Sequence, residues 1–355
     1  MRTFSLSAAA FADRMLSWYD ENRRLLPWRE DPTPYHVWLS EIMLQQTQVQ
    51  TVIPYYTRFI TELPQIADLA HVSEDRLHKL WEGLGYYSRA DHLREAAQIL
   101  LAEHNGLLPE SYSDLLALPG IGPYTAGAIA SIAFGERVAA VDGNVLRILS
   151  RVTAYDGPIN VASAAKPLKE LAASLVPAHR PGDFNQSLMD LGAMICSANG
   201  IPRCAACPLA ALCEAKKQQL TWLLPIKKAK KPRQIEPHTI VILNCGTQVW
   251  IHKRPQRGLL AGLWEFLDLP GTLDRDALAI HLKNLNITPD SLTDLGRAKH
   301  LFTHREWHMQ GWLVQLAAPA PLAEGMWVET SALQETYAMA GALSPYRSQL
   351  FEELL

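Results

Sequence analysis

The sequence has no apolar run that approaches the ~18 residues needed to cross a bilayer. It also has no signal-peptide core, because its Ser- and Ala-rich beginning soon meets Asp13, Asp20 and Glu21. These absences predict an intracellular protein without a membrane anchor. A chain of 355 residues is long enough to form two domains.

An excess of positive charge is also missing. The 33 lysines and arginines are outnumbered by 36 aspartates and glutamates, which gives a formal net charge of −3. Domains that bind nucleic acid through bulk charge are basic, so the composition argues against that mode of binding. Any contact with DNA has to be local, through a patch or through backbone amides.

Helical periodicity marks the first part of the chain, where apolar residues recur at three- and four-residue spacing. The segments are Ala8–Tyr19, Trp38–Thr57, Ser73–Leu80, Arg89–His104, Thr125–Phe134 and Gly143–Ala154. Between 216 and 233, seven basic residues and no acidic residue occur together with two prolines, which is typical of a linker.

Beyond this basic stretch the pattern predicts strands and short helices. The strands are Thr239–Leu243, Gln248–His252, Trp307–Gln315 and Met326–Glu329, and the helices are Asp274–Leu285 and Leu333–Ala338. We therefore expect a mainly α region over residues 1–215, a basic linker over 216–235 and a smaller α+β domain over 236–355.

Cysteine is scarce and unevenly distributed. Of five cysteines, four follow the pattern Cys196-x7-Cys204-x2-Cys207-x5-Cys213. Four thiolates in one short loop meet the ligand requirement of a [4Fe–4S] cluster. A structural zinc ion also accepts four thiolates, but its usual arrangement has two C-x-x-C pairs and only one is present. The spacing favours the iron–sulfur cluster and leaves a zinc site, or four unrelated buried cysteines, as the alternatives.

A glycine-rich turn lies between two helical stretches, in the sequence Leu-Pro-Gly-Ile-Gly-Pro-Tyr-Thr-Ala at 118–126. Gly120 and Gly122 permit positive φ and a tight reversal, and Pro123 suits the first position of a helix. Backbone N–H groups at such a turn can hold a phosphate without basic side chains. A plain helix–turn–helix corner is the alternative.

Two carboxylates are candidates for catalysis. Glu41 lies in an apolar helical stretch, where desolvation raises a carboxyl pKa and favours the protonated acid. Asp142 precedes a helix and can cap it, and the N–H groups that it accepts would keep it ionised. One acid and one carboxylate suit cleavage of a glycosidic bond through an oxocarbenium-like state. An exposed helix glutamate and a purely structural cap are the alternatives.

These motifs, in this order, resemble the helix–hairpin–helix glycosylases of the endonuclease III superfamily, and most closely the MutY family of adenine DNA glycosylases. The resemblance covers nearly the whole chain and rests on six segments, which are Trp38–Gln48, 83–90, Leu118–Ser131, Val141–Leu149, Asp190–Met194 and the cysteine loop. It implies a helix–hairpin–helix glycosylase region with an iron–sulfur loop, followed by a Nudix-like domain.

The resemblance also implies roles for matching residues. Glu41 would protonate the departing adenine, and Asp142 would stabilise the sugar cation, with Asn144 supporting the aspartate. Tyr124 occupies the hairpin position where bifunctional relatives carry a lysine. Because a phenol cannot form a Schiff base with the abasic sugar, we expect a monofunctional enzyme.

Further residues match positions that contact DNA. Gln46 and Tyr86 match residues that enter the base stack near the lesion, although core packing is the alternative for Tyr86. Phe302, Thr303 and His304 match the Phe-Ser-His loop that touches 8-oxoguanine. Threonine replaces the usual serine but keeps a hydroxyl for hydrogen bonding.

Two departures qualify the resemblance. The C-terminal domain lacks the Nudix pyrophosphatase signature, in which an Arg-Glu…Glu-Glu set supplies magnesium-binding carboxylates, so we expect it to recognise its ligand and not to hydrolyse it. The first gap of the cysteine loop has seven residues where the family usually has six. Because one added residue in an exposed loop costs little free energy, the cluster prediction stands.

The expected protein is a monomeric glycosylase of the bacterial cytoplasm that acts on duplex DNA with A·8-oxoguanine or A·G mispairs. An endonuclease III-like glycosylase/lyase for oxidised pyrimidines and a catalytically idle DNA-binding module are the alternatives.

Overall fold

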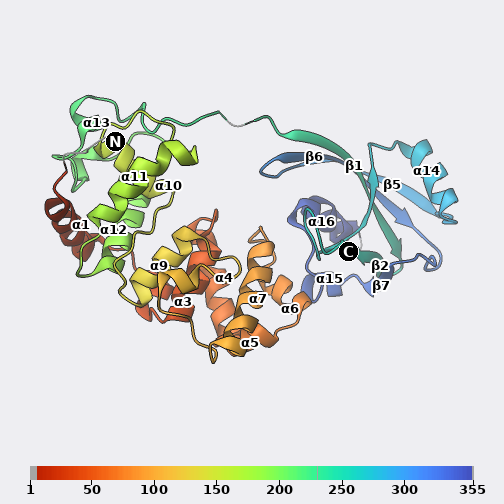
Figure 1. Cartoon of the computed structure of the whole chain (residues 1–355). Helices are drawn as coiled ribbons and strands as arrows, with labels where there is room; N and C mark the ends of the chain where they lie inside the picture. Colours follow the sequence, from red (N-terminus) through yellow and green to blue (C-terminus); the bar gives the residue numbers. More distant parts are fainter. Residues whose placement is uncertain (1–5, 230, 354–355) are drawn as a thin grey trace. The chain divides into compact units, whose positions relative to one another are not determined.

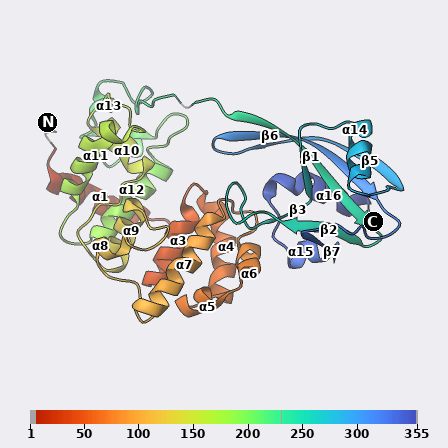
Figure 2. The same cartoon turned by 45° about the vertical axis from the view of Figure 1, so that its right-hand side comes forward.

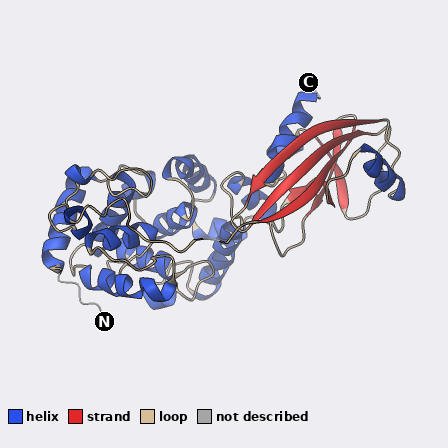
Figure 3. Cartoon of the chain, turned by 90° about the horizontal axis from the view of Figure 1, so that it is seen from above, coloured by secondary structure: helices blue, strands red, loops and turns tan. Residues whose placement is uncertain are grey.

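Within the described residues, helices make up the secondary structure as far as Lys217, and every strand lies beyond residue 233, as the sequence predicts (Figures 1 and 3). The computed structural model describes residues 6–229 and 231–353. The chain divides into two compact units. The first combines Met1–His71 with His92–Ala229, and the second combines Val72–Asp91 with Lys230–Leu355.

The first unit is built from helices. They are α1 (Ala8–Asn22), α2 (Pro27–Glu30), α3 (Pro34–Leu44), α4 (Val49–Glu62), α5 (Ile66–His71), α7 (Ser88–Glu103, mostly in this unit), α8 (Tyr112–Leu115), α9 (Pro123–Ala133), α10 (Gly143–Val152), α11 (Ala162–Leu175), α12 (Pro181–Met194), the 3-10 turn η1 (Cys204–Ala206) and α13 (Glu214–Lys217). One core joins α1, α10, α11 and α12, which gather together in Figure 2, around Phe11, Leu149 and Phe184.

The predicted single helix over Trp38–Thr57 is wrong, because the structure divides it into α3 and α4. Gln46 has a φ of 59°, and a left-handed residue cannot continue a right-handed helix. The break falls in the polar run Gln-Gln-Thr-Gln at 45–48, and a polar run in a helical pattern does not by itself reveal one residue of opposite hand. As a result Gln46 lies on a turn.

The second unit contains a seven-stranded sheet. Its strands are β1 (Gln234–Cys245), β2 (Gln248–Lys253), β3 (Trp264–Glu265), β4 (Leu267–Pro270), β5 (Ser291–Leu301), β6 (Arg305–Gln315) and β7 (Gly325–Glu329). The order is β3-β2-β1-β6-β5, with β4 beside β1 and β7 beside β2. Strands β1 and β6 are parallel, and the other pairs are antiparallel.

Helices cover both faces of this sheet. They are α14 (Arg275–Asn284), α15 (Ala332–Glu335), η2 (Gly341–Leu343) and α16 (Ser344–Glu353). Leu278 and Leu282 of α14 pack with Trp312 on one face. Tyr346 of α16 lies so close to Gly311 that a Cβ there would overlap the ring, and alternation along β6 places residue 311 on the opposite face.

Helix α6 (Glu74–Trp81) also belongs to the second unit. Lys253 Nζ lies 2.9 Å from Glu74 Oε1 and 3.0 Å from Asp75 Oδ1. Glu82, which follows the helix, pairs with Arg347 of α16 at 2.6 Å. These charged contacts join a segment from the helical half of the sequence to the sheet.

Candidate active site

Glu41 and Tyr124 meet although 83 residues separate them in sequence. Glu41 lies on α3 and is only 5% exposed, and Tyr124 is the second residue of α9. The phenol hydroxyl donates to Glu41 Oε2 at 2.7 Å. Pro123 occupies the start of α9, as predicted, so the hairpin aims the tyrosine at the carboxyl.

The electrostatics of Glu41 agree with the expected acid. Burial raises its pKa from 4.5 to about 7, against the opposing effects of the Tyr124 hydrogen bond and the Arg29 charge. The carboxyl is therefore largely protonated below neutral pH. The pKa of Tyr124 is raised well above 10, chiefly by burial, so the phenol keeps its proton.

Asp142 is the N-cap of α10, as its place before the helix suggested. One carboxylate oxygen accepts from the Val145 amide at 2.8 Å, and the other accepts from Asn144 Nδ2 at 2.6 Å. Burial nevertheless outweighs these hydrogen bonds and raises the pKa of Asp142 above its usual value. The hydrogen bonds to Asp142 that the sequence led us to expect are present, but they offset only part of the rise in pKa that burial causes.

Glu41, Tyr124, Asp142 and Asn144 line one cavity of about 540 Å³. Its other walls include Arg29, which sequence reasoning missed. Its lining residues include Tyr19, Arg24, Leu26, Trp28, Leu44, Gln186 and Met189. The cavity thus combines a buried acid, a second carboxylate and apolar walls, which suits an extruded base.

Arg29 is held by Asp190, whose side chain is fully buried. Arg29 Nη1 and Nη2 lie 2.8 and 3.1 Å from the two carboxylate oxygens of Asp190, and Arg24 Nε donates to the same group at 2.7 Å. The signal for this cluster in the sequence was the Asp190–Met194 match, which carried no role. The pairing keeps a positive charge beside Glu41.

A polar chain runs from Asp142 toward the cysteine loop. Asn144 donates to Asp142, and its own Oδ1 accepts from Arg147 Nη2 at 2.8 Å. Arg147 Nε donates to the Cys196 carbonyl at 2.8 Å. Helix α10 therefore connects the catalytic candidate to the loop through its first two turns.

All four cysteines of the loop line one small cavity together with Ile148, Arg151 and Leu209. Arg151 Nη1 donates to Cys196 Sγ at 3.2 Å. Within residues 6–229 and 231–353, no group of three or more His, Cys, Asp or Glu side chains gathers tightly enough to hold a single metal ion. The thiols thus surround a shared space rather than one point.

The glycine turn before α9 needs glycine at one of its two positions. Gly120 has a φ of 74°, and a Cβ there would lie 2.7 Å from His92 Cβ. Gly122 has a φ of −90° as the N-cap of α9, and a Cβ there would meet nothing within 4 Å. The tight reversal expected from the sequence depends on Gly120.

Tyr86 and the residues from Phe302 to His304 are brought together in the second unit. Phe302 N donates to the Arg305 carbonyl at 2.9 Å, so Thr303 and His304 form the turn between β5 and β6. Tyr86, 47% exposed, lies with its hydroxyl 3.2 Å from Thr303 Oγ1. We call the cavity of about 490 Å³ at this turn the hairpin cavity; its walls include Gly83, Gly85, Tyr86, Leu259, Leu260, Phe302, Thr303, His304 and Arg305.

Comparison with known proteins places these features in a class. Residues 39–178 match the family model of HhH-GPD superfamily base excision DNA repair proteins, and residues 238–349 match the NUDIX domain. The chain is therefore a base-excision DNA glycosylase with an added Nudix-like domain. This confirms the predicted fold class.

The relatives narrow the class further. The chain is 37% identical to the human adenine DNA glycosylase, over 88% of this chain and 68% of that protein. It is 35% identical to the adenine DNA glycosylase of Buchnera aphidicola subsp. Acyrthosiphon pisum, over 86% of this chain and 87% of that protein. The chain belongs to the adenine DNA glycosylase family, as the motifs indicated.

Solved structures are similar over the same architecture. A thermostable thymine-DNA glycosylase matches with a TM-score of 0.53 and 30% identity, over 59% of this chain and 97% of that one. Endonuclease III in a non-covalent complex with DNA matches with a TM-score of 0.51 and 23% identity, over 61% of this chain and 99% of that one, which supports the fold. No helix in the described part of the chain is long and apolar enough to cross a membrane.

Proposed function

We propose that this chain removes adenine mispaired with 8-oxoguanine, and secondarily with guanine, from duplex DNA. The observation that carries the proposal is the buried Glu41 carboxyl, held by Tyr124 at 2.7 Å in a cavity that Asp142 also lines. A protonated carboxyl beside a second carboxylate is the pair that cleavage through an oxocarbenium-like state requires.

In this proposal the adenine leaves the duplex and enters the cavity. Glu41 gives its proton to a ring nitrogen of the purine, which makes the base a better leaving group. Asp142 then stabilises the positive charge on the sugar through its carboxylate, which Asn144 and the Val145 amide keep oriented. Water completes the hydrolysis.

Monofunctional chemistry is favoured by the make-up of the cavity. Tyr124 stands beside Glu41, and among the described residues that line the cavity none is a lysine. A Schiff base requires a free amine. The glycosylase/lyase alternative therefore has no nucleophile here.

We further propose that Cys196, Cys204, Cys207 and Cys213 hold a [4Fe–4S] cluster. The four thiols share one cavity, and a four-iron cluster takes one thiolate on each iron, so it suits thiols spread around a space. When bound, the cluster cross-links the loop from 196 to 213. Arg151 donates to Cys196 and is placed to stabilise thiolate charge.

The remaining assignments are proposals that rest on the family. Residues 1–215 form the catalytic region, 216–235 the linker and 236–355 the lesion-recognition domain. Gln46, Tyr86, Gly120 and Gly122 contact the duplex, and Phe302, Thr303 and His304 read 8-oxoguanine in the hairpin cavity. The enzyme acts as a monomer in the bacterial cytoplasm.

The test is product analysis on duplexes that carry adenine opposite 8-oxoguanine, guanine or thymine. We expect free adenine from the first, less from the second and little from the third. Borohydride treatment during turnover should trap no enzyme–DNA adduct. Release of an oxidised pyrimidine, or an efficient trapped adduct, would favour the glycosylase/lyase instead.

A further inference from the structure

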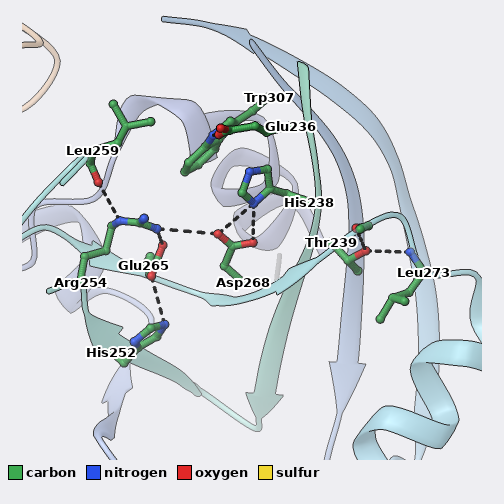
Figure 4. Close-up of polar contacts among 11 residues, drawn as sticks. Glu236, His238, Thr239, His252, Arg254, Leu259, Glu265, Asp268, Leu273 and Trp307 are labelled. Carbon is green, nitrogen blue, oxygen red and sulfur yellow. Dashed lines mark hydrogen bonds and ion pairs between the residues drawn. The ribbon is translucent and has the colours of Figure 1, made fainter. Parts of the chain in front are cut away.

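A buried charge network lies in the second unit, outside the catalytic cavity (Figure 4). Its centre is Arg254, which directly follows β2 and whose side chain is 17% exposed. Arg254 Nη1 pairs closely with Glu265 of β3 and lies 3.7 Å from Asp268 Oδ2 of β4. Both carboxylates are mostly buried, so the guanidinium compensates charge that would otherwise be costly.

The same guanidinium holds the loop that forms one wall of the hairpin cavity. Arg254 Nε donates to the Leu259 carbonyl at 3.1 Å, and the Arg254 amide donates to the Leu263 carbonyl at 2.9 Å. Leu259 and its neighbour Leu260 line the cavity. Arg254 therefore helps to hold this wall, through one side-chain donor and one backbone donor, beside the backbone bonds from Gly262 to Pro255 and from Leu263 to Leu260.

Arg254 is connected to a second wall of the cavity through two aromatic rings. The Arg254 guanidinium carbon lies 5.5 Å from the centre of the Trp307 ring. Trp307 in turn meets Phe302 edge-on, with ring centres 5.1 Å apart. Phe302 belongs to the turn that lines the cavity, so Arg254 touches both walls of the cavity directly or through one ring.

Other side chains hold Asp268 and Trp307 in place. His238 of β1 contacts Asp268 at 2.9 Å, and its ring lies tilted against Trp307 with ring centres 4.2 Å apart. Trp307 Nε1 donates to Glu236 at 3.2 Å. The indole is thus contacted by His238, Arg254 and Glu236, which leaves little freedom at the base of the turn.

We propose that Arg254 is a positioning residue that sets the distance between the two walls of the hairpin cavity, and thereby the discrimination between 8-oxoguanine and guanine opposite adenine. The inference rests on the proposed function. A lysine cannot replace the arginine, because the planar fork donates to the Leu259 carbonyl and to the Glu265 carboxylate while its central carbon lies over the Trp307 ring.

The first experiment compares Arg254→Lys with the wild-type enzyme on A·8-oxoguanine and A·G duplexes under single-turnover conditions. The ratio of the two rates should fall about tenfold, because a misplacement of ~1 Å can cost as much as ~100-fold. The rate on A·G should change little. An unchanged ratio would overturn the proposal.

Arg254→Gln alone leaves Glu265 without its cation and can lower stability, so the double variant Arg254→Gln/Glu265→Gln separates the two effects. It removes both charges and should regain thermal stability, yet it should still lack the preference. A stable double variant with wild-type preference would show that Arg254 only balances charge, and would refute the positioning role.

Tyr346→Phe is the matched control within the same unit. It removes a buried hydrogen bond, since Tyr346 donates to the Met309 carbonyl at 3.0 Å, but Tyr346 does not line the hairpin cavity. We expect a loss of stability with an unchanged ratio. A matching loss of preference in this variant would mean that general destabilisation explains the effect, and would overturn the proposal.

The pH dependence of the ratio is a second readout. Four charged or titratable side chains lie around Glu265. They are His252 of β2, Arg254 directly after β2, Asp268 of β4 and His238 of β1. Burial raises the pKa of Glu265 to about 7, so the group is ionised above that pH and neutral below it. The preference should therefore decline from pH 8 to pH 6 in the wild type and stay level in Glu265→Gln.

The ratio of the two rates also separates the proposed function from the positioning role of Arg254. Titration of Glu41 changes both rates alike, so it cancels in the ratio. A wild-type enzyme that excises no adenine from either duplex would refute the proposed function. A wild-type enzyme with strong preference, whose Arg254 variants keep it, would refute the positioning role alone.

Discussion

Replacing Glu41 with glutamine tests the catalytic assignment with almost no change of shape. The amide oxygen can still accept from Tyr124, whose hydroxyl lies 2.7 Å from the carboxyl oxygen. What disappears is the proton that the acid delivers. General acid catalysis contributes about 10²- to 10⁴-fold, so the rate of adenine release should fall by at least ~100-fold while binding to mispaired duplex persists.

The same variant should be more stable than the wild type at alkaline pH. The pKa of Glu41 is raised from 4.5 to about 7 by burial, so the folded protein keeps this proton after the unfolded chain has lost it. The destabilisation is absent below about pH 4.5, grows between the two pKa values and is complete above pH 7. Its size is roughly 3 kcal/mol, from ~1.4 kcal/mol for each pKa unit.

Two assays read out these effects. Single-turnover excision from an A·8-oxoguanine duplex gives the chemical step, and thermal unfolding at pH 5 and pH 8 gives the change of stability. The Glu41→Gln variant should show a higher unfolding midpoint at pH 8 and a smaller advantage at pH 5. Near wild-type excision would refute the acid role, and a lower midpoint at pH 8 would refute the desolvation argument.

Three further tests have definite expected outcomes, and two of them include a control substitution. Tyr124→Phe removes a hydrogen bond that lowers the pKa of Glu41, so the alkaline limb of the rate profile should move to higher pH; an unmoved limb would contradict the coupling. A bound [4Fe–4S] cluster would make the purified protein brown, and Cys204→Ser should abolish this colour, whereas Cys245→Ser, outside the loop, should keep it; a colourless wild type containing zinc would reverse the cofactor proposal. Thr303→Val should weaken the preference for 8-oxoguanine over guanine severalfold while Thr303→Ser retains it; equal ratios would exclude a role for the hydroxyl.

Much of the architecture could be read from local patterns. The helices that begin at Glu74 and Gly143 carry strong periodicity, and Ser73 and Asp142 cap them as local chemistry requires. Strand β5 was missed, because this edge strand buries few of its residues and so lacks the clear alternation of a half-buried strand.

The sequence indicated several residues of the candidate site, but not the pairing of its charged groups or the net pKa of its carboxyls. The motif matches selected Glu41, Tyr124 and Asp142, but not the Arg29–Asp190 pairing, which joins residues 161 positions apart. The net pKa of Asp142 depends on how much burial opposes its two hydrogen bonds. The sequence indicates which groups can donate to Asp142, but only the three-dimensional packing shows how deeply the carboxyl is buried.

The membership of α6 in the sheet-containing unit has a practical consequence for dissecting this enzyme. Cutting the chain after residue 229 would strip Glu74 and Asp75 of Lys253, and Glu82 of Arg347. It would also leave Lys79 without the carbonyls of Leu333 and Tyr337 that accept from its ammonium group. A shortened enzyme with poor activity would therefore report damage to a stretch of helix next to Tyr86 as well as the loss of a reading domain, and single substitutions are the cleaner way to assign roles to either half.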